Sequence, residues 1–447
     1  MTKLNDTNKK QRSWGDRKSS KSRKINIFYP LLIALVIAIL ILFYSFNRLN
    51  NVINDLNDQI LYNKKQSKHI SSIPHFVTIV MPSVVNKKGS TSRLNAITET
   101  WGPAANAIYI LDKNNFLQFP NLNILHHSFI NSSNINDNPN MFSMNSFPMR
   151  LSIPTQIEET ENGFERLQFV IQTLAQPNLF PTTQYFFFVN DHTFVIPDKL
   201  CHFLTRFTNE KSNSYPNHSG NDKHLYAGHA LKNQKDSFAF NSGASGYILS
   251  RLTLESLVKR WKQKDPNCII TDDRPIFFQN NPGLITAKCL QQSLGVSPID
   301  TRYPNKSHIF HAFGIIRTAT KMVDSWYFSK HEGLHYLLPN QFSSDYQNVF
   351  GEDDTIDSCS IDTISFHYVE CHETKALYYI RQYLINRPSL SDKDLKRIIQ
   401  NKWPDNKENG WIGGYAKPLP RDDDIENWNA IVKTFRKISN SNSICEL

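Results

Sequence analysis

The sequence contains few cysteines, and none of them is closely spaced with another. The chain has 447 residues and six cysteines, no two of which lie two to four residues apart: Cys201, Cys268, Cys289, Cys359, Cys371 and Cys445. Structural zinc sites need such close pairs, so the sequence does not favour one. In an oxidising compartment these cysteines are available for disulfides, and the spacing leaves their pairing open.

A basic globular body is also missing, although the net charge of the chain is +10. Residues 1–24 carry +7 of this charge, which leaves +3 for the other 423 residues. A protein that binds nucleic acid through its phosphates presents a basic surface on its folded body. The sequence therefore predicts no nucleic-acid partner.

One long apolar run follows the basic tail. Residues 27–46, IFYPLLIALVIAILILFYSF, are 20 residues without a charge, and as a helix they span about 30 Å, the thickness of a bilayer's hydrocarbon core. A cleaved leader has a shorter apolar region and a small-residue cleavage site, which residues 45–48 do not provide. The positive-inside rule predicts a single-pass type II membrane protein, with residues 1–26 cytosolic and the remainder lumenal.

Residues 47–73 are predicted to form a polar stem between the membrane anchor and the body. Apolar residues recur at three-to-four spacing from Leu49 to Ile60, as in two heptads of a coiled coil that would form a homodimer. A solvated amphipathic stalk has the same pattern, and two heptads are marginal for dimerisation. Both interpretations stay open.

From residue 74 the pattern alternates between strands and helices. Strands are predicted at residues 75–82, 106–112 and 185–189, and helices at residues 93–102 and 163–175. This order predicts an α/β fold with a mostly parallel sheet flanked by helices. Ligands of such sheets bind at the carboxyl ends of the strands.

The strand predicted at residues 185–189 ends in a polar triplet. Asn190, Asp191 and His192 interrupt an apolar run that resumes with Phe194. A carboxylate at a strand end can hold a divalent cation, which neutralises the charge on a diphosphate leaving group. Asp and Asn are also common turn formers, so the triplet taken alone favours a plain turn.

Six segments, in the same order, resemble glycosyltransferase family 31, in particular its fringe and core 1 β1,3-galactosyltransferase branch. They are RLNAITETWG (93–102), FVNDHTFVIPDKL (188–200), LYAGHA (225–230), FNSGASGYILSR (240–251), FHAFG (310–314) and CSIDTISFHYVE (359–370). The family consists of type II Golgi membrane enzymes with a GT-A fold. The resemblance implies a GT-A-like, Rossmann-like catalytic domain at residues 74–379, and it leaves residues 380–447 as a C-terminal extension without an assigned role.

The resemblance also implies substrates, a cofactor and site residues. The expected reaction is inverting transfer of galactose from UDP-galactose, in β1,3 linkage, to O-linked N-acetylgalactosamine on a glycoprotein or glycan. Manganese or magnesium is the implied cofactor. The metal ligands carried over are Asp191, His192 and His311, and the nucleotide-sugar contacts are Asn190, Asp191, Arg93, Gly243 and Gly246. Asn190 and His192 lack two charges that the family's three carboxylates supply, which predicts a weaker and more pH-sensitive metal site. His367 is interpreted as a packing residue.

The catalytic base is the main departure from the family pattern. The family places an Asp shortly before a cysteine, but the corresponding run here, NPGLITAKC (281–289), contains no acid. Asp272 and Asp273, just upstream, are the candidate bases, and they suit a surface turn equally well. A non-catalytic lumenal folding partner, or a lectin-like module on the same fold, is the alternative function.

Overall fold

A computed structural model of the chain describes its folded body. The described residues are 76–82, 89–112, 119, 122–124, 148–154, 157, 163–177, 179–209, 224–233, 238–270, 281–302, 307–321, 327, 329–330, 359–403 and 418–440. The tail, membrane span and stem predicted within residues 1–73, and the dimer predicted through the stem, lie outside them. Within the described residues, no helix combines the length and apolar character needed to cross a membrane.

Among the described residues, eight strands form one mixed sheet in the order β11-β7-β10-β5-β1-β2-β4-β3. Five of the seven neighbouring pairs are parallel, and of these eight strands β10 alone runs antiparallel to its neighbours. The predicted α/β class is confirmed, with a sheet that is mixed but has more parallel than antiparallel pairs. The strands of this sheet are β1 (Phe76–Met81), β2 (Ala107–Leu111), β3 (Asn123–Ile124), β4 (Met149–Ser152), β5 (Tyr185–Asn190), β7 (Tyr226–Gly228), β10 (Tyr247–Ser250) and β11 (Ile299–Asp300).

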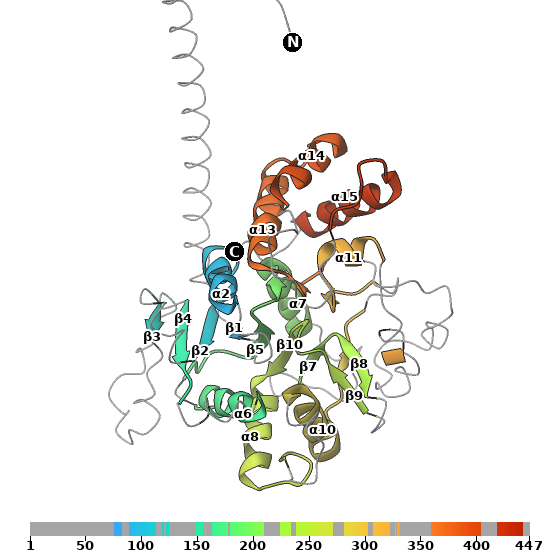
Figure 1. Ribbon diagram of the computed structural model, residues 1–447. Helices are drawn as coiled ribbons and strands as arrows, with labels where there is room; N and C mark the ends of the chain where they lie inside the picture. The colour runs from blue at the N-terminus through green and yellow to red at the C-terminus, as the bar shows by residue number, and fades with distance from the viewer. Residues whose placement is uncertain are drawn as a thin grey trace, which may run out of the picture. The chain divides into compact units, whose positions relative to one another are not determined.

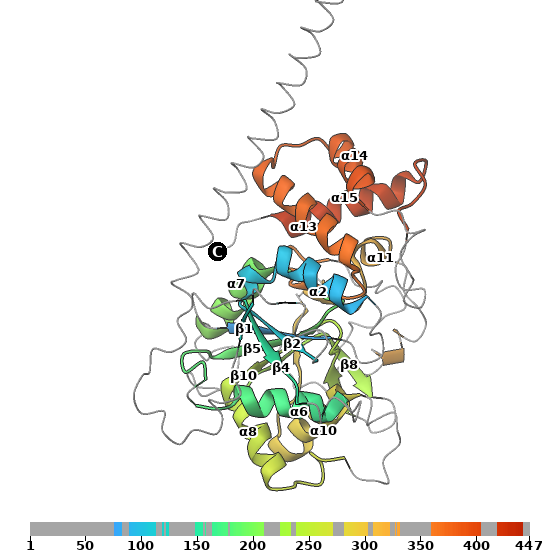
Figure 2. The same cartoon turned by 60° about the vertical axis from the view of Figure 1, so that its left-hand side comes forward.

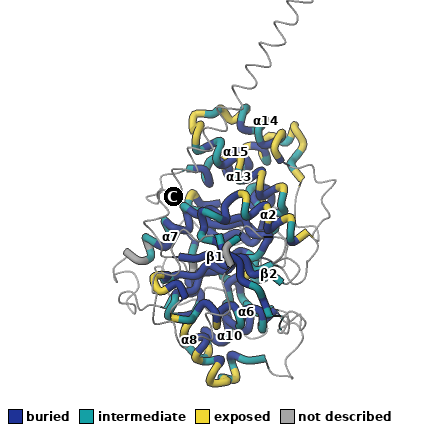
Figure 3. Tube along the Cα trace, turned by 90° about the vertical axis from the view of Figure 1, so that its left-hand side faces the viewer, coloured by how far each residue is buried: buried dark blue, intermediate teal, exposed yellow. Residues whose placement is uncertain are grey.

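Helices cover both faces of the sheet (Figures 1 and 2). One face packs against α6 (Gly163–Leu174), α8 (Arg251–Lys262) and α10 (Pro282–Leu294), and the other against α2 (Ser90–Glu99) and α7 (Pro197–Asn209). Strand residues alternate between two apolar clusters: Val77 and Ile79 of β1 belong to the first, and Phe76 and Val80 to the second. Strands that are apolar on both faces are typical of a sheet buried between helix layers, and Figure 3 shows that buried layer along the strands.

The predicted elements agree with the structure, except at the first helix. That helix was expected over residues 93–102, but α2 spans Ser90–Glu99, and a 3₁₀ helix follows at Pro103–Ala105. The amide of Gly102 donates to the carbonyl of Ile97 (2.9 Å), so the chain turns there instead of continuing the helix. A side chain at Gly102 would collide with the hydroxyl of Tyr109, which explains the glycine.

Two smaller sheets and a group of C-terminal helices complete the described fold. The three-stranded sheet has the order β12-β13-β6, and β8 pairs with β9. The strands are β6 (Phe194–Val195), β8 (Ala230–Asn233), β9 (Phe238–Asn241), β12 (Phe310–His311) and β13 (Ser365–Phe366), and the helices are α11 (Ile315–Ala319), α13 (Cys371–Asn386), α14 (Asp392–Lys402) and α15 (Ile425–Ser439). Because β6 directly follows the polar triplet and pairs with β13, the residues after β13 lie next to the triplet.

The C-terminal helices share the apolar cluster on the α2 face of the sheet. Leu377 of α13 and Phe435 of α15 are fully buried in it. Arg381 of α13 pairs with both carboxylate oxygens of Asp198 in α7 (2.6 and 2.7 Å), and it donates to the carbonyl of Ile438 (3.0 Å). Helix α13 also runs without a break across residue 379, where the sequence suggests the end of the catalytic domain.

Candidate functional site

The polar triplet lies where the order of strands in the sheet reverses. From β1 the chain fills one side of the sheet with β2, β3 and β4, and it then returns to place β5 on the other side of β1. Asn190, the last residue of β5, is in register with Met81, the last residue of β1. In open α/β sheets the crevice outside the carboxyl ends of two such strands is the usual ligand site.

Asn190 builds the turn that follows β5. Its Oδ1 accepts hydrogen bonds from the amide of His192 (3.0 Å) and from the hydroxyl of Thr193 (2.9 Å), and the amide of Thr193 donates to the carbonyl of Asn190 (3.1 Å). This is the bonding by which Asn commonly forms turns. Asn190 therefore has a local structural function in addition to any contact with a ligand.

Asp191 forms a buried ion pair with Arg93. Oδ2 of the carboxylate lies 3.0 Å from Nε and 2.9 Å from Nη2 of Arg93, and the two side chains are 0% and 3% exposed. Arg93 lies near the start of α2, and its Nη1 is 3.7 Å from Oε2 of Glu370. Arg93 and Asp191, both predicted to contact the nucleotide-sugar, thus lie together and pair with each other.

His192 lies between two carboxylates. Its Nδ1 is 3.5 Å from Oε1 of Glu370, and its Nε2 is 4.0 Å from Oδ1 of Asp191. The carbonyl of His192 accepts a hydrogen bond from the amide of Val369 (2.9 Å), which ties the triplet to the segment after β13. The imidazole is held near both charges, and only 4% of it is exposed.

His367, interpreted from the sequence as a packing residue, lies at the site. Its Nε2 is 3.4 Å from Nδ2 of Asn190, and its ring is 6.4 Å from that of His192 in an edge-on arrangement. Burial, followed by the charge of His192, lowers the pKa of His367 from 6.5 to about 3, against the opposing effect of a hydrogen bond to the Ala312 backbone. At neutral pH the imidazole is therefore uncharged, and in the tautomer that carries its proton on Nδ1 its Nε2 accepts a hydrogen bond from Nδ2 of Asn190.

Glu370 is a site residue that the sequence did not single out. It is the N-cap residue of α13 and it faces both Arg93 and His192. Burial raises the pKa of Glu370, but the hydrogen bonds and charges of His192 and Arg93 outweigh burial and leave this pKa below its ordinary value. The side chain is 21% exposed, so an ionised carboxylate is within reach of solvent here. Its position directly after the FHYV segment was the signal available in the sequence.

Glu373, one turn further along α13, has the opposite environment. Its Oε2 accepts a hydrogen bond from the amide of Glu370 (2.9 Å). Burial raises the pKa of Glu373 to about 7, while the hydrogen bond from Glu370 lowers it and the charge of Glu370 raises it. The pKa values of two carboxyl groups on one helix end are thus shifted in opposite directions, because one meets Arg93 and His192 and the other is enclosed by the core.

His311 packs in the core. It is fully buried, its ring stacks on Phe366 with 4.7 Å between centroids, and its Nε2 is 3.1 Å from the hydroxyl of Thr363. Within the part of the chain that the structure describes, no three His, Cys, Asp or Glu side chains are grouped to hold a metal ion. The predicted set of Asp191, His192 and His311 is not brought together among these contacts.

The glycine-rich turn between β9 and β10 contacts Thr193, the residue after the triplet. The hydroxyl of Thr193 lies 2.9 Å from the carbonyl of Ala244. Gly246 has a φ of +88°, and a Cβ there would lie 2.6 Å from the ring of Phe187, so packing against β5 requires the glycine. Gly243 is exposed, and a Cβ there would meet nothing closer than 3.9 Å. The two glycines are therefore present for different reasons.

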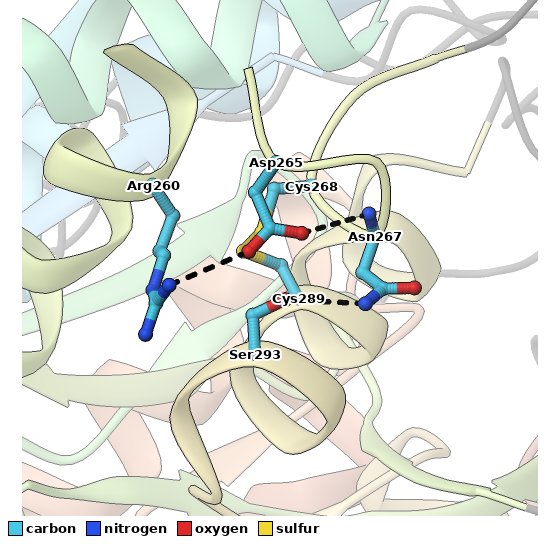
Figure 4. The surroundings of a disulfide bond; sticks show 6 residues. All are labelled: Arg260, Asp265, Asn267, Cys268, Cys289 and Ser293. Carbon is cyan, nitrogen blue, oxygen red and sulfur yellow. Dashed lines mark hydrogen bonds and ion pairs between the residues drawn. A yellow bond between two sulfur atoms is a disulfide. The ribbon is translucent and has the colours of Figure 1, made fainter. Parts of the chain in front are cut away.

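The candidate bases Asp272 and Asp273 lie outside the described residues. The segment that contains them is flanked by a disulfide between Cys268, after α8, and Cys289 in α10 (Figure 4). Asn267 next to it donates to Oδ1 of Asp265 (3.0 Å) and lies 3.4 Å from the hydroxyl of Ser293. The turn after α8 is thus fixed to α10.

No protein-family model matches this sequence, and a comparison with curated proteins gives no match either. The function is therefore argued from the α/β fold and from the polar site at the end of β5.

Proposed function

We propose that the chain is an inverting, UDP-sugar-dependent glycosyltransferase with a GT-A-like domain. The observation that carries this proposal is the position of the Asn190–His192 triplet at the carboxyl end of β5, beside β1, where the strand order reverses. The choice of UDP-galactose as donor, O-linked N-acetylgalactosamine as acceptor and a β1,3 linkage comes from the sequence resemblance. A Golgi membrane location with a lumenal body belongs to the same proposal.

The reaction needs positive charge near the leaving group. The acceptor oxygen bonds to the anomeric carbon as the bond to the diphosphate breaks, so UDP leaves with the electron pair, and a base takes the hydroxyl proton. Arg93 at the start of α2 and the N-terminus of α13 meet at this site. Helix N-termini and guanidinium groups both favour anions. Because Glu370 already caps α13, the guanidinium of Arg93 is the group assigned to orient the diphosphate, in place of its contacts with Asp191 and Glu370.

The predicted binding site for a divalent cation does not match the positions of the side chains. Bound manganese or magnesium would neutralise charge on the diphosphate. However, Oδ2 of Asp191 already lies 2.9 and 3.0 Å from two nitrogens of Arg93. His311 is in the core, with its Nε2 3.1 Å from the hydroxyl of Thr363. As these side chains lie, the three predicted ligands do not fit one ion.

A transfer assay tests the proposal. The purified full-length chain is incubated with labelled UDP-galactose and benzyl-α-N-acetylgalactosamine, with manganese or with a chelator. The expected result is a β1,3-linked disaccharide. Replacing Asp272 and Asp273 together with Asn is expected to lower kcat by about 10²–10⁴ while donor binding stays unchanged, because a general base contributes about that much. Absence of transfer to any hexose or N-acetylhexosamine acceptor would overturn the enzymatic proposal.

A non-catalytic lumenal folding partner is the second candidate. It is favoured by the engagement of Asp191 with Arg93 and by the first turn of α10, residues 282–285, which contains no acid. A Cβ at Gly283 would meet nothing closer than 3.9 Å, so the backbone there accepts a residue with a side chain. If the wild-type chain binds UDP-galactose without transfer and Gly283→Asp transfers galactose, the chain has lost its base and this candidate is favoured.

A further inference from the structure

A buried amide without hydrogen bonds lies beside the site. Asn241, the last residue of β9, is 0% exposed, and neither its Oδ1 nor its Nδ2 has a hydrogen-bond partner in the structure described here. The hydroxyl of Ser245, four residues later, is also buried and has no hydrogen-bond partner in the same set of residues. Buried polar groups are nearly always bonded, so two unbonded groups flanking one turn call for an explanation.

The two side chains flank the turn that contacts Thr193, the residue after the triplet. Besides the contact of Thr193 with this turn, the hydroxyl of Ser365 donates to the carbonyl of Ser245 (2.5 Å). Asn241 packs over β7, where a Cβ at Gly228 would lie 3.1 Å from its Cβ and Cγ. Gly228 is paired with Tyr247 at the start of β10. The amide therefore lies at the same edge of the sheet as the triplet.

The turn between the two side chains reaches solvent at its tip. Gly243 at the tip is exposed and Ala244 is partly buried, whereas Asn241 and Ser245 on either side are buried. Leaving two polar groups unbonded destabilises the closed turn, so opening it is less costly than opening a turn whose polar groups are satisfied. A ligand that bonds to these groups would stabilise the open form.

We propose that Asn241 and Ser245 bind hydroxyl groups of the hexose that is transferred at this site. The inference rests on the proposed function, because it assigns the sugar-binding part of the same site. A carboxamide offers a donor and an acceptor side by side, and a serine hydroxyl offers both, which matches vicinal hydroxyls of a neutral sugar. Neither side chain carries a charge that would attract a phosphate.

Binding of two probes by the full-length chain tests the inference. The affinities for UDP and UDP-galactose are measured by titration calorimetry for the wild-type chain, Asn241→Leu and Ser245→Ala. We expect each variant to bind UDP as the wild type does and UDP-galactose at least about tenfold more weakly, the effect of losing one well-placed hydrogen bond. Both variants remove an unbonded polar group, so each is expected to raise Tm.

Thr286 in α10 provides the matched control. Its hydroxyl is also buried without a hydrogen-bond partner among the described residues, and it is not part of the turn. Thr286→Val is expected to raise Tm as the other variants do and to leave both affinities unchanged. If Asn241→Leu and Ser245→Ala are folded and bind UDP-galactose like the wild type, the inference is wrong. If the wild type binds UDP and UDP-galactose with the same affinity, only the inference about Asn241 and Ser245 is wrong. If it binds neither probe, the proposed function is wrong as well.

Discussion

Replacing Asp191 with Asn tests whether the buried ion pair at the site stabilises the fold. The carboxylate is 0% exposed, and two nitrogens of Arg93 lie 2.9 and 3.0 Å from its Oδ2. An amide at this position leaves the guanidinium without its nearest counter-ion, and removing one partner of a buried pair costs about 3–5 kcal/mol. Glu370, 3.7 Å from Nη1 of Arg93, offsets part of this loss. We therefore expect the free energy of unfolding to fall by about 3 kcal/mol.

Urea unfolding of the full-length chain, followed by circular dichroism, measures this loss. The double variant Arg93→Met with Asp191→Leu is expected to recover most of it, because packed apolar residues often replace a buried pair without loss.

An exposed ion pair provides the matched control for this measurement. Nζ of Lys375 lies 2.5 Å from Oε2 of Glu99, but the two side chains are 49% and 58% exposed. Lys375→Ala is expected to cost less than about 1 kcal/mol. If Asp191→Asn costs no more than this control, the pair does not stabilise the fold as its burial implies, and the reasoning is refuted.

Three further predictions concern other parts of the fold. Because the pKa of Glu373 is raised to about 7, its ionisation opposes folding increasingly as pH rises from about 4.5 to 7. Glu373→Gln should therefore be as stable as the wild type near pH 4, and at pH 8 its free energy of unfolding should be higher by on the order of 3 kcal/mol. A difference in urea midpoint that does not change with pH would contradict this. Replacing Cys268 and Cys289 with Ser opens a loop of 21 residues and should lower the free energy of unfolding by about 3 kcal/mol. Urea unfolding measures this loss, and the wild type in the presence of reductant should be as unstable as the double variant. Gly246→Ala should destabilise the chain by about 2–4 kcal/mol, because Gly246 has a positive φ and packs closely on Phe187. Gly243→Ala should change stability by less than about 0.5 kcal/mol, because a Cβ there meets nothing close. Similar Tm values for the two variants would show that the turn is not packed as described.

The sequence predicted the α/β class and several strands and helices because these elements follow local patterns. Apolar runs of five or six residues became β1, β2 and β5, and the periodic run at residues 163–175 became α6. The end of α2 was placed late, because the apolar periodicity of Ile97 and Trp101 continues past Glu99, where α2 ends and the chain begins the turn at Gly102. Side-chain packing against Tyr109, which is distant in sequence, decided that boundary.

The candidate site was predicted only in part. Asn190, Asp191 and His192 could be found because they interrupt one apolar run. The contacts of this triplet with His367 and Glu370 depend on the pairing of β6 with β13, which brings together residues more than 150 positions apart. The contact with Arg93 comes from α2, 98 positions before Asp191. His311 and His367 follow similar apolar segments, and the sequence does not show that one ring packs on Phe366 while the other lies at the triplet.

The connections of α13 to α7 and α15 determine how the protein can be shortened for biochemical work. A fragment that stops at residue 379 would cut α13 in its middle, remove Arg381 from Asp198, and expose the apolar surface that Phe435 covers. Such a fragment would be expected to aggregate whether or not the transferase proposal holds. A usable expression boundary therefore lies no earlier than the end of α15 at Ser439.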